Sequence, residues 1–162
     1  MRFGTLHGVA IALLALTDAN PLHAQAQQTP PAPRITLEEA RVAMDAAEAE
    51  ARSNRWNLAF VITDAEATPI YVRRMDEVPT RNYEIAMNKV QTAITSGMHT
   101  AEYAAAVKAQ RIQPIEGALT FDGGLLLRRG GQVVGAFSAS GARGAEDAQA
   151  VRAGMAAIGI EP

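Results

Sequence analysis

The side chains suited to chemistry in this sequence are few, and the first is a histidine. His99 lies in the stretch SGMHT at residues 96–100. The other two histidines, His7 and His23, fall in an N-terminal segment that we expect to be removed. Imidazole is the commonest metal ligand in proteins and ligates iron well. His99 is therefore a candidate metal ligand; the alternative is a solvated histidine at a helix end, stabilised by the dipole of the preceding helix.

Lys89 is the second candidate, because it lies in a helical stretch otherwise rich in Ala, Met and Val. A partly buried lysine could pair with Asp76 or Glu116, hold the carboxylate of a ligand, or act as a catalytic base. A structural ion pair where a helix meets the sheet explains the residue equally well.

An arginine and two carboxylates could hold or protonate a ligand. Arg74 and Asp76 lie two residues apart at the end of a predicted strand, on one face, so a local salt bridge competes with ligand binding as their role. Glu116 precedes Gly117 in a loop where glycine allows a close backbone approach. A carboxylate there is a candidate general acid or base, although one carboxylate alone does not define a mechanism.

The loop SASGARG at 138–144 leads into the last predicted helix. Ser140 and Gly141, with small side chains next to a helix N-terminus, could cradle an anion such as a carboxylate. Against this, Glu146 and Asp147 already complement the dipole of that helix. The sequence has no Walker, dinucleotide-binding or nucleophile-elbow motif.

Composition excludes several classes of site and partner. The chain has no cysteine, which excludes a Cys nucleophile, a thiolate zinc site, an iron–sulfur cluster and covalent c-type haem attachment. The formal net charge is -2 and no basic stripe is present, so we expect no nucleic acid partner. One Trp and four Phe predict a modest core, which favours further burial by homo-oligomerisation.

The first 26 residues have the form of a secretory signal peptide. Arg2 precedes the apolar run GVAIALLAL at 8–16, which is too short to span a membrane, and Ala24 and Ala26 offer cleavage sites. Residues 27–34 form a Pro-rich tether. We therefore expect one domain at 35–160, in a protein that is periplasmic or secreted and has no membrane partner once the leader is removed.

Capping residues and apolar spacing predict the helices. Thr36 and Glu39 form a capping-box pattern, and Thr80 and Thr100 are expected to cap two further helices. The expected helices are 36–53, 80–96, 100–109 and 145–158.

Alternating apolar residues and turn signals predict five strands. We expect the first to have one buried face, and Gly130-Gly131 predicts a tight hairpin between the last two. The order of elements contains no repeated βαβ unit, so the expected class is α+β, an antiparallel sheet with helices packed on it. The expected strands are 56–63, 69–75, 118–120, 125–129 and 132–138.

Several of these landmarks occur together. They include AFVITDA at 59–65, the helix that carries Lys89, VVGA at 133–136, Ser140-Gly141 and the acidic start of the last helix. In this combination the chain resembles the GlcG/HbpS-like haem-binding domain family, which includes the C-terminal domain of PduO. The resemblance covers nearly all of residues 35–159, and Lys89 matches a recurrent lysine of the family.

The resemblance implies a profilin-like sandwich around an antiparallel sheet of about five strands, assembling into homo-oligomers. It also implies non-covalent haem binding, which some members show, whereas others lie in pathways for small metabolites. The chain departs from the family pattern at 64–68, DAEAT, where paired glycines are usual. It departs again at His99, where a proline is common, and this change could create an iron ligand.

The leading hypothesis is an exported haem-binding protein with its pocket near Arg74, Lys89, His99 and Glu116. Asp76, Ser140 and Gly141 are further candidate ligand-binding residues. The alternative is a small cofactor-free enzyme acting on an aromatic or hydroxy-acid metabolite, a small planar anion, with Lys89 or Glu116 as acid or base. A purely partner-binding role is a third possibility.

Overall fold

The structure is a computed structural model, which describes Met1, Gly4 and residues 33–161 of the chain. Apart from Met1 and Gly4, the expected signal peptide lies outside the described residues, as do residues 27–32 of the expected tether. Within the described part, no helix is long and apolar enough to cross a membrane.

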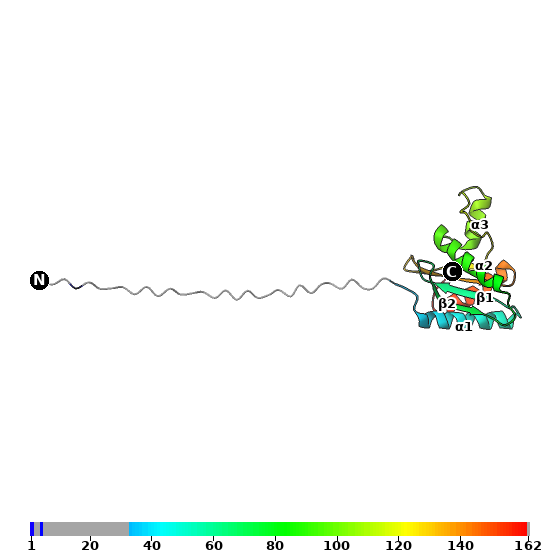
Figure 1. Ribbon diagram of the computed structural model, residues 1–162, viewed down its shortest axis with the longest axis horizontal. Coiled ribbons are helices and arrows are strands. Elements are labelled where there is room, and N and C mark those ends of the chain that lie inside the picture. Colours follow the sequence, from blue (N-terminus) through cyan, green and yellow to red (C-terminus); the bar gives the residue numbers. More distant parts are fainter. Residues whose placement is uncertain (2–3, 5–32, 162) are drawn as a thin grey trace. The chain divides into compact units, whose positions relative to one another are not determined.

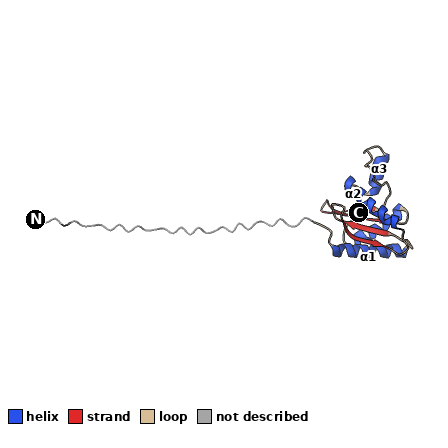
Figure 2. Ribbon diagram, viewed as in Figure 1, coloured by secondary structure: helices blue, strands red, loops and turns tan. Residues whose placement is uncertain are grey.

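The strands are β1 (Ala59–Thr63), β2 (Pro69–Arg74), β3 (Gly124–Arg129) and β4 (Gln132–Ser140). They form one antiparallel sheet in the order β2-β1-β4-β3, and strands are drawn red in Figure 2. The hairpins β1–β2 and β3–β4 supply two strands each, and β1 pairs with β4 in the centre.

The expectation of about five strands was wrong, because residues 118–120 are not a strand. They follow a turn at 116–117, and the amide of Leu119 donates to Oγ1 of Thr92, 3.0 Å away, instead of to a neighbouring strand. The hydroxyl of Thr92 therefore accepts the hydrogen bond that a neighbouring strand would otherwise have accepted.

Helices cover both faces of the sheet. Figure 1 shows α1 on one side of β1 and β2 and α2 on the other, and α4 packs with α1. The helices are α1 (Leu37–Ser53), α2 (Thr80–Ser96), α3 (Thr100–Lys108) and α4 (Gly144–Ala157).

The helix ends follow the expected caps in part. The capping box is confirmed: Oγ1 of Thr36 accepts from the Glu39 amide at 3.2 Å, and the Glu39 carboxylate accepts from the Thr36 amide at 2.9 Å. Thr80 and Thr100 are instead the first helical residues, after Pro79 and His99. Gly97 ends α2 with a φ of 69°, as its position predicted.

The core has two layers because the central strand is buried on both faces. All five residues of β1 are buried, which corrects the expectation of one buried face. Phe60 and Ile62 pack towards α1 and α4, whereas Val61 packs towards α2 with Val90 and Leu126. A strand covered by helices on both sides needs apolar residues at consecutive positions, so its alternation is weak.

Candidate functional site

Lys89 lies at the centre of a buried polar cluster between α2, β4 and α4. Its side chain is 2% exposed, and its Nζ donates to Oδ2 of Asp147 and to the carbonyl of Ala139, each at 2.8 Å. The second carboxylate oxygen of Asp147 accepts from the Ala142 amide at 3.0 Å. Burial raises the pKa of Asp147, and the charge of Lys89 opposes that shift.

The partner of Lys89 is therefore Asp147, not Asp76 or Glu116 as the sequence suggested. Sequence reasoning assigned Asp147 to the dipole of the last helix, and 58 residues separate the pair along the chain. The available signal was the co-occurrence of one lysine in an apolar helix and one acid in the first turn of another, since a buried charge requires a partner.

Glycine makes room for this ion pair. Gly123 has a φ of 106°, and a Cβ there would lie 2.7 Å from Nζ of Lys89 and 2.6 Å from Cβ of Asp147. A side chain at this position would collide with both partners. The stretch before β3 therefore packs directly on the charged pair.

A cavity of about 240 Å³ opens beside Lys89 and Asp147. Ser140 also lines it and is 5% exposed. The remaining lining residues are Ile85, Phe121, Ala142 and Gly144. The structure thus brings together two of the predicted site residues, Lys89 and Ser140, and adds Asp147 and Phe121, which sequence reasoning missed.

Gly141 has a structural role beside this cavity. Its φ is 150°, and a Cβ there would lie 2.2 Å from the carbonyl oxygen of Asn57. The residue allows the end of β4 to pass close to the segment before β1, and it does not line the cavity.

Arg74 lies at a different place, beside β2. Its Nη1 donates to the carbonyl of Val78 at 2.7 Å, and with Val72, Thr80 and Tyr83 it lines a hollow of about 280 Å³. The expected salt bridge with Asp76 is not formed, because Asp76 lies in the turn after the strand and Arg74 turns to the backbone.

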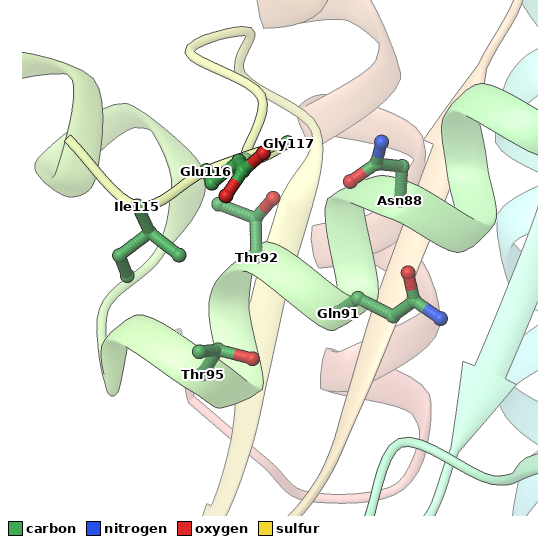
Figure 3. A pocket seen from close by; sticks show the side chains of 8 residues that line it. Asn88, Gln91, Thr92, Thr95, Ile115, Glu116 and Gly117 are labelled. Atoms are coloured by element: carbon green, nitrogen blue, oxygen red, sulfur yellow. The ribbon is translucent and has the colours of Figure 1, made fainter.

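Glu116 lines a third hollow, a groove of about 520 Å³ on the outer face of α2. Figure 3 shows Glu116 above Thr92, with Asn88, Gln91 and Thr95 along the helix. The groove is rich in amide and hydroxyl groups, and Glu116 itself is exposed. Lys89 and Glu116 therefore line separate cavities and do not form one acid–base pair.

His99 and Thr100 cover the outer edge of β3. Nδ1 of His99 accepts from the Leu126 amide and Oγ1 of Thr100 from the Gly124 amide, each at 3.0 Å. Because β3 is an edge strand of the sheet, these two hydrogen bonds satisfy amides that could otherwise pair with another strand. The SGMHT corner is thus an edge-protecting element.

Burial lowers the pKa of His99 below its ordinary value of 6.5. Arg128 and Arg152 act in the same direction, while Glu102 and Asp122 oppose them. The imidazole is therefore neutral, and because Nδ1 accepts a hydrogen bond, Nε2 carries the proton. Among the described residues, no group of three or more His, Asp or Glu side chains is arranged to hold a metal ion.

Comparison with known proteins identifies the family. A profile of the family described as haem degrading protein HbpS-like matches residues 35–156, most of the chain. The chain belongs to the HbpS-like family. The match begins two residues before α1 and ends within α4, so it includes every element that surrounds Lys89.

Solved structures share the fold of this HbpS-like chain. A crystal structure of HbpS is 28% identical with a TM-score of 0.72, and covers 84% of this chain and 98% of that one. A double variant of Streptomyces reticuli HbpS gives the same identity and TM-score over 88% and 99%. A PduOC–haem complex is 24% identical, with a TM-score of 0.70 over 79% and 97%. No curated protein sequence matches significantly.

Proposed function

We propose that this HbpS-like chain is an exported protein that binds haem non-covalently. The observation that carries the proposal is the family match over residues 35–156, together with a PduOC–haem complex of the same fold. Export is supported by the leader-like pattern of residues 1–26. Haem supplies an iron centre for ligand exchange and redox chemistry when bound.

His99 is the only histidine among the described residues. Its protonation state favours iron ligation, whereas its hydrogen bond to Leu126 disfavours it. The neutral imidazole of His99 is the form that ligates metals. However, Nδ1 is occupied by the Leu126 amide, and the proton on Nε2 blocks the second nitrogen. Ligation by His99 therefore requires the ring to release that amide, at a loss of about 1 kcal/mol for the hydrogen bond.

Two arginines near His99 suit the carboxylates of haem. Arg128 and Arg152 are exposed, and their charges lower the pKa of His99. Neither forms an ion pair with a described residue, and Arg128 donates to the carbonyls of Gly97 and Gly131. Guanidinium groups bind carboxylates in a bidentate manner. We propose that these arginines hold the propionates and that His99 is the candidate iron ligand.

The cavity beside Lys89 does not suit haem. Its volume of about 240 Å³ lies below the range of roughly 300–1,000 Å³ that is typical of drug-sized ligands. We therefore place haem at the SGMHT corner, on the surface. A homo-oligomer is part of the proposal, because a partner subunit that covers this surface would remove the haem face from water.

Absorption titration of the mature chain, from Gln27, with hemin tests the proposal. We expect a saturable Soret shift with a stoichiometry of one haem per subunit. Metal-free protoporphyrin, followed by fluorescence, is the matched ligand, because it keeps the propionates and lacks iron. Binding of hemin at least tenfold tighter than protoporphyrin indicates iron ligation, and absence of a saturable Soret shift contradicts the proposal.

The arginine contacts are tested with Arg128→Gln/Arg152→Gln. This variant keeps long polar side chains and removes both charges, so we expect weaker binding of hemin and of protoporphyrin alike. Arg111→Gln, which changes an exposed arginine near the end of α3, is the control. Equal affinity of the double variant and the control would exclude the arginines as propionate partners.

A further inference from the structure

We propose that the cavity beside Lys89 binds a small carboxylate with a planar apolar body, at a site separate from that of haem. The cavity lies between α2, the end of β4 and the N-terminus of α4, and buried polar groups form its floor. The family match names no residue of this cavity.

Lys89 has a hydrogen-bond donor left for a ligand. An ammonium group carries three N–H bonds, and two of them are directed at Asp147 and at the carbonyl of Ala139. No third acceptor is found among the described residues. A buried unpaired donor is unfavourable, so an oxygen atom within the cavity would complete the set.

Ser140 supplies a second polar contact. Its hydroxyl forms no hydrogen bond to any described residue, whereas Ser138, one alternation earlier on the same strand, donates to the carbonyl of Ala86. The side chain is buried and lines the cavity. It is therefore free to donate to a ligand oxygen.

The N-terminus of α4 adds a third group that favours an anion in the cavity. Gly144 is the first residue of this 14-residue helix and lines the cavity. The first amides of a helix have no intrahelical acceptor, and the helix dipole favours an anion there. Lys89 and the Ala142 amide already engage both oxygens of Asp147. Arg143 engages both oxygens of Glu146, so neither carboxylate has an oxygen left to occupy this helix end.

The apolar residues that line the cavity indicate which group the ligand carries beside its carboxylate. Ile85 and Phe121 are the larger apolar side chains of the lining, and Phe121 is 58% exposed, so a ligand in the cavity would cover part of its ring. Three donors on one side and an aromatic ring on the other match a carboxylate attached to a flat apolar group. The small volume limits this group to about one ring.

Titration of the isotopically labelled mature chain with benzoate, followed by ¹H–¹⁵N NMR, tests the proposal. We expect saturable shifts centred on residues 139–147 and on Phe121. Benzamide has nearly the same shape without the charge, and we expect it to bind at least tenfold more weakly. Equal binding of the two ligands, shifts centred on the groove of Figure 3, or no saturable shift with benzoate would overturn the proposal.

Two variants locate the contacts. Ser140→Ala removes one donor and should weaken benzoate binding by about five- to tenfold. Phe121→Ala, at an exposed position, should weaken it as well. Thr95→Ala changes the groove on the outer face of α2 and is the control, with unchanged affinity expected. Unchanged affinity in both cavity variants would exclude this cavity.

Haem binding and benzoate binding can be tested independently of each other. Saturating benzoate should leave the hemin titration unchanged, because the two ligands occupy different places. Competition between benzoate and hemin would show that a propionate enters the cavity and would overturn the claim of a separate site.

Discussion

The imidazole of His99 and the backbone amide of Leu126 are joined by a hydrogen bond of 3.0 Å that closes the outer edge of β3. A residue that the sequence offered as a candidate iron ligand is thus also part of the fold. Iron ligation at this position and protection of the sheet edge compete for the same imidazole ring.

The stability of the fold should depend on pH through His99. Its pKa is lowered in the folded state, so the unfolded chain binds the proton more readily. The stabilisation is complete above the unfolded value of 6.5 and is lost as the pH falls from there through the folded value. Urea unfolding of wild type between pH 8 and pH 5 should show this loss.

His99→Asn is the matched variant for that experiment. The amide oxygen of Asn can accept the Leu126 hydrogen bond, Asn is a good helix N-cap, and it does not titrate. Its free energy of unfolding should change less than that of wild type over the same pH range. Parallel pH profiles for the two proteins would contradict the assignment.

Thr100 should matter to stability more than a residue at a corner usually does. Thr100→Val keeps the shape and removes the acceptor of the buried Gly124 amide, at a cost of about 1–3 kcal/mol. Thr100→Ser keeps the hydroxyl and is the control. Hydrogen exchange at Gly124 should accelerate in the Val variant and not in the Ser variant. Equal exchange in both would show that Thr100 does not protect this edge.

Lys89 and Asp147 should be strongly coupled in stability. Lys89→Met strands a buried carboxylate and should destabilise the chain by about 3–5 kcal/mol. The double variant Lys89→Met/Asp147→Asn removes both charges and should be less destabilised than the single variant. A double-mutant cycle in urea measures the coupling, and additive effects would show that the pair is not a functional unit of the fold.

Local chemistry in the sequence was enough to predict much of this fold. Thr36 and Glu39 lie three residues apart and cap α1 as predicted, and Gly130-Gly131 connects β3 to β4 in a tight hairpin. These features depend on neighbours in the chain. The family was predicted as well, because its short motifs occur in order along the sequence.

Features that depend on distant partners could not be predicted in the same way. The pairing of Lys89 with Asp147 requires α2 and α4 to approach the same end of β4, and no local pattern encodes that approach. The segment 118–120 has strand-like composition, yet its Leu119 amide donates to the hydroxyl of Thr92 and not to a neighbouring strand. The predicted site residues Arg74, Lys89 and Glu116 proved to line three separate cavities, since their positions depend on the packing of α2.

Titration of hemin into wild type, His99→Asn and His99→Ala, followed at the Soret band, tests the central claim most directly. The Asn variant keeps the acceptor for the Leu126 amide and loses only the imidazole, so it separates iron ligation from damage to the sheet edge. We predict a saturable shift for wild type and an altered Soret position and weaker binding for both variants. A saturable wild-type shift reproduced unchanged by His99→Asn would remove His99 as the iron ligand, and no saturable shift in wild type would contradict haem binding itself.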